Sequence, residues 1–454
     1  MIMALDLDSI KRARILHIST EKLSAPLIRR GIRRYKQLSS VYPTHKVVAY
    51  FVGRVAVRVR AFLTSRWIRL GALSRRLRSR KRSAKSGMAE TLSYCVRLSG
   101  GLGDALIAAR MARDLQAELG AHATFDIVFH SPKAIEPFFE GIAGFRKAFS
   151  DELFDAVAHR YDFVLIANQF LTFPNGISDR ARIARNFPKL PTMLDRAQNA
   201  LKTIDMYVKV HPALDGAFAD LAVVQGYKRY TYLHEMLGIP YGGDRLPLPI
   251  DPGVIARLGL EEGAYVTVHN GWDANFKMVT ERPTKALPLD SWVQIVAEIK
   301  AMRPDLHIVQ LGGKTGEDIP GVDVNLKNKL KFMESVSVLA GSCLHVDTES
   351  GLVHAAACLG VRSIVMFGPT NVDWFGYPQN INVAPKQCGN CWWASDSWMD
   401  ICVMGHEPAI CTSSSSISPT DVAHRAVLAL QEECGGGHAR SAIRPHVLFR
   451  EVLP

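Results

Sequence analysis

The sequence predicts an α/β protein with two doubly wound domains, and three observations predict it. Apolar residues make up 48% and charged residues 22% of the 454 residues, which is enough to form sizeable cores. Short apolar runs alternate with amphipathic helical patterns, as expected for a parallel sheet covered by helices. The alternation occurs twice, on either side of a Pro- and Gly-rich stretch at 242–253. Two domains are also what this length suggests.

Each predicted domain contains its own series of strands. The first series has strands at 92–98, 125–130 and 162–167, with a helix at 105–119. The second has strands at 265–270, 306–312, 343–347 and 363–368, with helices at 290–302, 331–340, 351–359 and 420–433. We therefore expect an extension over 1–90, domains over 91–245 and 246–435, and a tail over 436–454. Two such domains place a ligand cleft between them, at the carboxyl ends of their strands.

The positive charge is concentrated in the extension. The net charge is +12, yet residues 1–87 contain 22 of the 55 basic residues and only three of the 43 acidic ones. The remaining residues are net acidic, which argues against a nucleic-acid-binding body. Residues 47–82 form a helical pattern with an Arg-rich face opposite an apolar face. This pattern fits either peripheral contact with an anionic membrane or a solvated extension.

The sequence also bears on the compartment. No apolar run approaches the ~20 residues that cross a bilayer. The first ten residues are acidic, whereas a secretory signal begins with basic residues. We expect a cytoplasmic protein with reduced thiols, either free or at the inner face of the cytoplasmic membrane.

A glycine-rich turn follows the first strand. It differs from the dinucleotide fingerprint because Leu106 stands where a small third residue is required. Gly101 and Gly103 still allow a ligand close to the backbone, which makes this an acceptor-side loop. Asp104 follows at the start of the helix, where it either caps the helix or acts as a general base. The helix dipole favours its ionised form in both cases.

A second loop combines hydroxyl groups with a helix start. The strand at 343–347 ends at Asp347, and the loop Thr348–Gly351 leads into a helix whose first N–H groups suit phosphate. Thr348 and Ser350 supply hydroxyl donors, while Gly351 permits close approach. This loop is therefore predicted to bind a phosphorylated ligand.

Three further residues are candidates for the same site. His354 lies on the first turn of the helix and is either a ligand-binding or a core histidine. Thr370 ends the next strand–turn segment at the same predicted sheet edge. Lys285 precedes the helix at 290–302, where a cation would stabilise the charge of a leaving diphosphate.

Four cysteines lie within 24 residues. Cys388, Cys391, Cys402 and Cys411 follow the spacing C-x2-C-x10-C-x8-C, which suits one tetrahedral metal ion. With all four positions filled by protein, such a metal would be structural. The alternative is a set of independent reduced thiols.

Three strings carry a resemblance to a known family. GGLGDALIA at 100–108, TKALPLDSW at 284–292 and DTESGLVHAAACLGVRSIVMFGPT at 347–370 resemble glycosyltransferase family 9, the bacterial heptosyltransferases, in order and spacing. The resemblance covers about residues 92–432. It implies the GT-B fold, in which two Rossmann-like domains face a central cleft. It also implies inverting, metal-independent transfer from a nucleotide sugar, typically ADP-heptose, to a glycan or protein hydroxyl.

The resemblance also implies roles for individual residues. Asp104 matches the catalytic base, and the residues that match the donor-binding positions are Lys285, Asp347, Thr348 and Gly351. One departure is visible. The family usually has a Ser–Gly or Thr–Gly pair directly after the aspartate, whereas Glu349 and Ser350 here precede Gly351.

The cysteine segment resembles one subgroup of that family. CGNCWW at 388–393 and CTSSSSISPTDV at 411–422 are similar to the heptosyltransferases that modify autotransporter proteins, in which the metal is iron. Four thiolates suit zinc as well as iron, so the residues do not decide between these metals.

Two other function classes remain open from the residues. A nucleotide-dependent oxidoreductase with a Rossmann fold would account for the glycine turn, and a nucleic-acid-binding protein would account for the basic arm and the cysteines. Leu106 and the acidic body weigh against these alternatives. A nucleotide-sugar donor and a glycan or protein acceptor are the expected partners.

Overall fold

The computed structural model describes residues 31–32, 35–36, 38–40, 42–53, 55, 91–173, 180–274, 278–395 and 397–435. Most of the predicted basic helix over 47–82, and the whole tail over 436–454, lie outside these ranges. Contacts divide the chain into two compact units. The N-terminal unit comprises residues 52–205 and 230–249, and the C-terminal unit comprises residues 1–51, 206–229 and 250–454. Residues 206–229 thus pack with the C-terminal unit although they precede the last part of the N-terminal unit.

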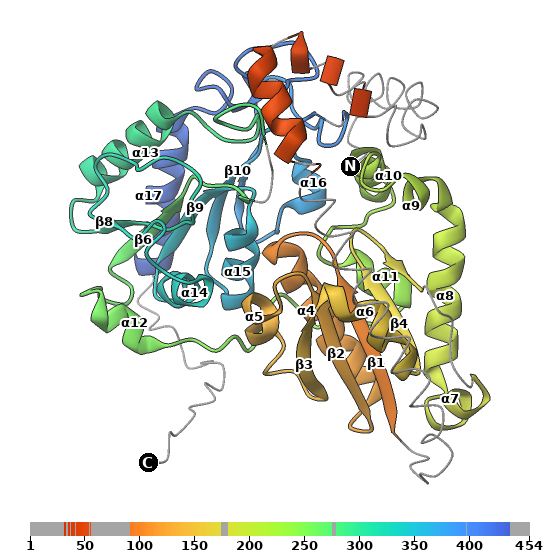
Figure 1. Ribbon diagram of the computed structural model, residues 1–454. Helices are drawn as coiled ribbons and strands as arrows, with labels where there is room; N and C mark the ends of the chain where they lie inside the picture. Colours follow the sequence, from red (N-terminus) through yellow and green to blue (C-terminus); the bar gives the residue numbers. More distant parts are fainter. Residues whose placement is uncertain are drawn as a thin grey trace. The chain divides into compact units, whose positions relative to one another are not determined.

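The N-terminal unit is an α/β layer (Figure 1). Its strands are β1 (Leu92–Leu98), β2 (Ala123–Phe129), β3 (Phe145–Ser150), β4 (Phe163–Ala167) and β5 (Leu171–Thr172). Its α-helices are α4 (Leu102–Leu119), α5 (Pro132–Ile135), α6 (Phe154–Val157), α7 (Arg180–Asn186), α8 (Lys189–Thr203) and α11 (Tyr232–Leu237), and its 3-10 turns span Glu136–Phe138, Asp151–Leu153 and Ala158–Arg160. The order is β3-β2-β1-β4-β5, with only the β4–β5 pair antiparallel.

The C-terminal unit contains a six-stranded sheet in which every neighbouring pair of strands is parallel, together with the helices that pack around it. Its strands are β6 (Tyr265–His269), β7 (His307–Gln310), β8 (Val324–Asn325), β9 (Leu344–Thr348), β10 (Ser363–Met366) and β11 (Ile381–Val383), in the order β11-β10-β9-β6-β7-β8. Its helices are α10 (Asp215–Val224), α12 (Pro252–Arg257), α13 (Leu289–Met302), α14 (Phe332–Ala340), α15 (Gly351–Leu359), α16 (Val372–Phe375) and α17 (Pro419–Gly435), with a 3-10 turn at Ile410–Thr412. The helix α9 (Asp205–Val210) begins at the boundary between the units.

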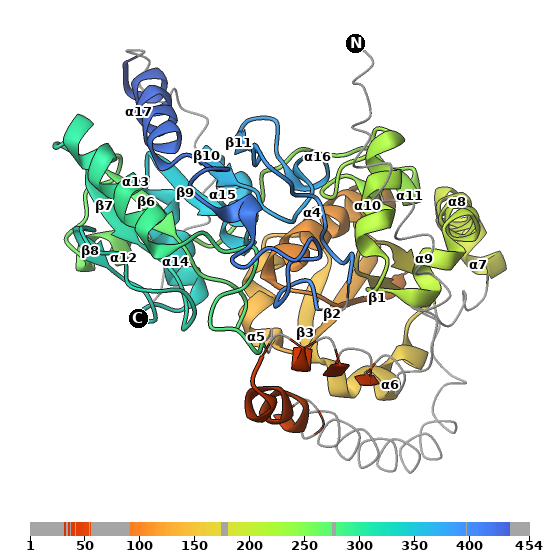
Figure 2. The ribbon, with the colours of Figure 1, turned by 90° about the horizontal axis from the view of Figure 1, so that it is seen from above.

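The core of the C-terminal unit explains why these segments pack as they do. Figure 2 shows α13 and α17 on one side of the sheet and α12 and α14 on the other. Trp292 and Ile295 of α13 pack with Val422 of α17 against Val266 and Val346 of the strands, all of them buried. The apolar face that each helix presents at helical spacing is therefore the face that covers the sheet.

In both sheets the order in which the chain adds strands reverses at one point. In the N-terminal unit the chain builds β1, β2 and β3 outward and then places β4 on the other side of β1. In the C-terminal unit it builds β6, β7 and β8 outward and then places β9 on the other side of β6. Ligands of open α/β sheets bind outside the carboxyl ends of the strands at this switch point. The predicted loop at Gly101–Asp104 follows β1, and the predicted loop at Thr348–Gly351 ends β9.

The predicted α/β class with two doubly wound units is confirmed. The predicted strands at 92–98 and 265–270 and the predicted helix at 351–359 correspond to β1, β6 and α15. The cleft between domains concerns the placement of the two units and stays a prediction. Within the described ranges, no helix combines the length and apolar character needed to cross a membrane.

Part of the basic extension packs onto the C-terminal unit. Residues 44–53 are helical, and Val47 and Tyr50 are buried with Leu38 against Val279. The Tyr42 hydroxyl donates a hydrogen bond of 2.7 Å to the backbone oxygen of Asp400. The described part of this segment is therefore held by an apolar contact and a hydrogen bond.

Candidate functional site

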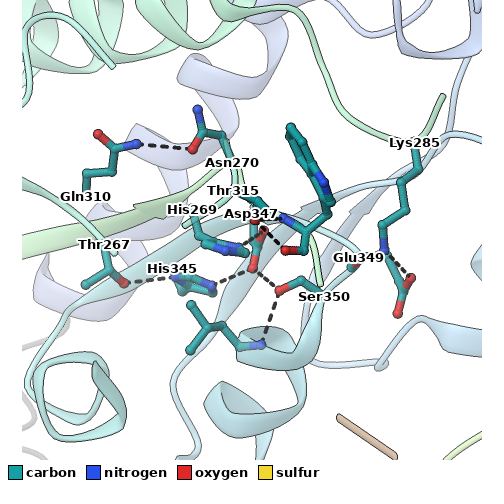
Figure 3. Close-up of polar contacts among 12 residues, drawn as sticks. Thr267, His269, Asn270, Lys285, Gln310, Thr315, His345, Asp347, Glu349 and Ser350 are labelled. Carbon is teal, nitrogen blue, oxygen red and sulfur yellow. Dashed lines mark hydrogen bonds and ion pairs between the residues drawn. The ribbon is translucent and has the colours of Figure 1, made fainter. Parts of the chain in front are cut away.

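The candidate site lies where β6 and β9 end, at the switch point of the C-terminal sheet. His269 is the last residue of β6, and it pairs in register with Asp347 of β9. Figure 3 shows the side chains of His269, His345 and Ser350 directed at the Asp347 carboxylate. Sequence-distant polar groups are thereby gathered at one sheet edge.

The Asp347 carboxylate is the centre of this cluster. Its side chain has no exposed surface, and its two oxygens lie 2.9 Å from His269 Nδ1 and 3.1 Å from His345 Nε2. The Ser350 hydroxyl donates a further hydrogen bond. Burial alone would raise the pKa of Asp347, but the charges and hydrogen bonds of His269 and His345 outweigh it and lower the pKa to about 2. The carboxylate is thus ionised although it is buried.

Asp347 consequently organises the site from within. The Asp347 side chain has no exposed surface, and its hydrogen bonds fix the groups around it. The direct donor binding that the resemblance implies for this residue stays a prediction.

The start of α15 is the part of the site suited to an anion. Ser350 is the N-cap, and its Oγ accepts a hydrogen bond of 3.1 Å from the backbone N–H of Leu352. Gly351 is the first helical residue, and Thr348 ends β9 as a buried residue. The helix dipole and the first N–H groups of α15 favour a phosphate here.

A cation, a carboxylate and an imidazole meet beside this helix start. Lys285 Nζ donates a hydrogen bond of 3.1 Å to the backbone oxygen of Glu349 and lies 3.8 Å from Glu349 Oε2. His354 Nε2 lies 3.9 Å from Glu349 Oε1, while His354 Nδ1 is 2.7 Å from the Tyr377 hydroxyl. The structure therefore brings the predicted residues Lys285 and His354 together through Glu349.

Two residues of this cluster were missed from the sequence. Glu349 was noted only as an insertion, although its position directly before the Ser350–Gly351 pair was a usable signal. His269 was treated as an ordinary strand residue. The one feature of the sequence that points to a site residue here is its position near the end of the predicted strand at 265–270, just before Gly271.

The cysteine-rich segment supports the loops that carry Lys285 and Thr370. The backbone N–H of Thr284 donates to the Met399 oxygen at 2.9 Å, and the Thr412 hydroxyl donates to the Thr284 oxygen at 3.2 Å. The Trp392 N–H donates to the Pro369 oxygen at 2.8 Å. The segment at 388–412 therefore positions both sides of the candidate site.

A glycine is required where this segment meets the turn before Thr370. A Cβ on Gly368 would lie 2.6 Å from Thr412 Cγ2. Thr370 follows as a buried residue. The close approach that Gly368 permits is one reason why the cysteine-rich segment and the turn pack together.

The cysteine cluster only partly gathers. Cys402 and Cys411 are buried together with Ala409, and Cys388 packs against them. In the part of the chain that the structure describes, however, no three His, Cys, Asp or Glu side chains are arranged to hold a metal ion. The predicted four-cysteine metal site, which includes Cys391, is therefore not confirmed.

Asp104 lies in the N-terminal unit at the third position of α4. Its carboxylate accepts a hydrogen bond of 3.1 Å from the Gly101 N–H, which is the capping contact considered from the sequence. Gly100 has φ +113°, and a Cβ there would lie 2.3 Å from Asp104 Oδ2. Gly103 is buried within α4. The glycines thus let the turn close over Asp104, and the role of base stays a prediction.

One stretch of the chain matches the model of a sequence family. Residues 303–400 match the model of glycosyltransferase family 9 (heptosyltransferase). This match covers β7 to the cysteine-rich segment and includes Asp347, Ser350 and Thr370. It favours the transferase over the oxidoreductase and nucleic-acid-binding alternatives. A search of curated proteins found no match.

Several solved structures are similar to the chain. ADP-heptose LPS heptosyltransferase II of E. coli is 15% identical, with 75% of this chain and 100% of that chain covered and a TM-score of 0.44. The family 9 glycosyltransferase of Veillonella parvula is 13% identical, with coverages of 76% and 98% and a TM-score of 0.46. The iron-containing dodecameric glycosyltransferase TibC of enterotoxigenic E. coli is 13% identical, with coverages of 76% and 77% and a TM-score of 0.47. Likenesses this distant say nothing about the reaction of this chain.

The buried carboxylate predicts a pH-dependent stability. The pKa of Asp347 is about 2 in the folded state, below its ordinary value of 3.8. A carboxyl group whose pKa is lower in the folded than in the unfolded state stabilises the fold at pH values above its unfolded-state pKa. This stabilisation is lost as the pH falls through the folded-state pKa. We expect Asp347→Asn to lower the free energy of unfolding above pH 4, with the difference from wild type narrowing by about 2 kcal/mol between pH 4 and pH 2.

Urea-induced unfolding of both proteins between pH 2 and pH 7 measures this difference. A difference that stays constant over the whole range would contradict the ionised, imidazole-paired state of Asp347.

Proposed function

Because this chain is a glycosyltransferase whose residues 303–400 carry the family 9 sequence, we propose that it transfers a heptose or related sugar from an ADP-sugar to a glycan or protein hydroxyl. The observation that supports this most is the anion-binding edge where β6 and β9 end. A nucleotide-sugar donor carries a diphosphate, and this edge offers a helix start, hydroxyl groups and a lysine.

The donor's diphosphate would lie at the start of α15. The N–H groups of Gly351 and its neighbours and the hydroxyl of Thr348 would donate hydrogen bonds to it. Lys285 would exchange part of its contact with Glu349 for the phosphate oxygens. These groups stabilise the charge that develops on the leaving diphosphate, so the proposed transfer is metal-independent.

The remaining predicted residues would support this arrangement. Asp347 would act through Ser350, whose hydroxyl it fixes. His354 is held by Tyr377 and would orient Glu349 toward Lys285. Thr370, on the turn supported by the cysteine-rich segment, would face the donor from the end of the neighbouring strand.

Asp104 would act as the general base. As the acceptor oxygen attacks the anomeric carbon, its proton passes to the Asp104 carboxylate and the bond from that carbon to the diphosphate oxygen breaks. The electron pair leaves with the nucleoside diphosphate, and attack from the opposite face inverts the anomeric configuration. The Gly101 N–H holds one carboxylate oxygen at 3.1 Å, which orients the group.

Replacing the base tests this assignment without removing the helix cap. In Asp104→Asn the amide oxygen still accepts from the Gly101 N–H, but the side chain no longer accepts a proton. We expect kcat for transfer of heptose from ADP-heptose to fall by about 100-fold or more. Mass spectrometry of the glycosylated product gives the rate.

A matched control separates catalysis from capping. Glu334 occupies the same third position in α14 and accepts a hydrogen bond of 2.8 Å from the Lys331 N–H. Glu334→Gln should leave kcat unchanged. A wild-type rate for Asp104→Asn, with the fold intact by circular dichroism, would remove Asp104 as the base.

The four cysteines give a second test. We propose, from their spacing, that they bind one structural iron or zinc. Elemental analysis of the purified protein should find about one such metal per chain. Cys391→Ser should lose it, whereas Cys343→Ser, a buried strand-side cysteine outside the cluster, should retain it. Equal metal content in the two variants would rule out the four-cysteine site.

A further inference from the structure

We propose that His269 is a further donor-binding residue, whose Nε2–H donates a hydrogen bond to the donor's diphosphate. The proposal rests on the proposed function, because it assumes a nucleoside diphosphate at the ends of β6 and β9. It adds a residue that lies outside the matched range 303–400. Four observations support it.

The first observation is the orientation of the imidazole ring. Nδ1 lies 2.9 Å from Asp347 Oδ1, and a carboxylate accepts hydrogen bonds, so Nδ1 carries a hydrogen. This contact fixes the plane of the ring. The other nitrogen, Nε2, therefore has one direction only, which is set by Asp347.

The second observation is the space around Nε2. A Cβ on Gly271 would lie 2.9 Å from Nε2, and a Cβ on Gly312 would lie 3.2 Å from Cδ2 of the same ring. Both residues follow the ends of strands, β6 and β7, where ligands of such sheets bind. The absence of a Cβ at both places leaves space beside the ring tip. About 10% of the His269 side chain is exposed, and among the described residues its one hydrogen bond runs through Nδ1.

The third observation is the pairing of the second histidine. His345 Nε2 lies 3.1 Å from Asp347 Oδ2, and its Nδ1 lies 3.0 Å from the Thr267 hydroxyl oxygen. Both nitrogens of His345 are thus occupied within the buried cluster, whereas His269 contacts the cluster through Nδ1 alone.

The fourth observation is the shared anchor. Ser350, the N-cap of α15, and His269 are both bound to the Asp347 carboxylate, through different oxygens. One buried group therefore sets the direction of the imidazole and of the helix cap together. An anion held at the start of α15 would therefore lie near the end of β6, where His269 is the last residue.

Two histidines on one carboxylate provide a matched comparison. His345 contacts Asp347 at 3.1 Å and His269 at 2.9 Å, but His345 has no exposed surface and both of its nitrogens have partners. His345 is thus a structural histidine, and His269 differs from it in the open Nε2. A merely structural role for His269 predicts that the two residues respond alike to substitution.

The test compares ADP with adenosine, which lacks the diphosphate. In His269→Asn the amide nitrogen replaces Nδ1 and keeps the contact with Asp347, while the group at the Nε2 position is lost. Isothermal titration calorimetry should show ADP affinity reduced about tenfold or more, as for loss of a charge-assisted hydrogen bond, with adenosine affinity unchanged. His345→Gln keeps a donor toward Asp347, and the ratio of ADP to adenosine affinity should equal that of wild type.

The possible results separate this proposal from the proposed function. Equal loss of ADP and adenosine affinity in His269→Asn, no loss of either, or the same selective loss in His345→Gln would overturn the role of His269 alone. Wild-type protein that binds none of ADP, GDP, UDP and CDP would overturn both proposals. If His269→Asn does not fold, His269→Gln replaces it. That variant puts an N–H near the Nε2 position but loses the contact of Nδ1 with Asp347 that sets its direction, and it should lose ADP affinity about threefold or more relative to adenosine.

Discussion

The buried, ionised carboxylate of Asp347 is the interaction on which the rest of the candidate site depends. It lies at the end of β9, next to β6, where the strand order of the sheet reverses. It accepts hydrogen bonds from His269 of β6, from His345 of β9 and from Ser350, the N-cap of α15. Leaving such a charge in the interior is tolerable only because every contact to it is a hydrogen-bond donor. The carboxylate therefore fixes the geometry of the sheet edge.

The loops that carry Lys285 and Thr370 are held in place by residues of the cysteine-rich segment. Lys285 lies on a loop whose backbone is held by Met399 and Thr412, and the turn before Thr370 is held by Trp392. The cysteine-rich segment thus positions both loops through hydrogen bonds. Asp400 lies in the same segment. Its side chain accepts a hydrogen bond from the backbone N–H of Val279, and its backbone oxygen accepts one from the Tyr42 hydroxyl. The N-terminal extension and the loop of Lys285 are thereby joined.

The sequence was sufficient for most of the fold, because strands such as β1 and β6 are short, mostly apolar runs and α15 begins at a Ser–Gly pair. It did not predict β3, whose six residues are largely half-buried and include Arg146 and Lys147, or β8, which has two residues. It placed Ser350, Lys285 and His354 at one site, but it did not point to Glu349 or His269. Whether a carboxylate is buried, and which nitrogen of an imidazole is open, depends on pairing between strands 78 residues apart, which no local pattern records.

A crystal structure of the protein with ADP tests the central claim most directly. The account predicts the diphosphate at the ends of β6 and β9, within hydrogen-bond distance of the first N–H groups of α15, Lys285 Nζ and His269 Nε2, with Asp347 still enclosed by the two imidazoles. A diphosphate bound elsewhere, or one that contacts Asp347 while His269 turns away, would contradict it.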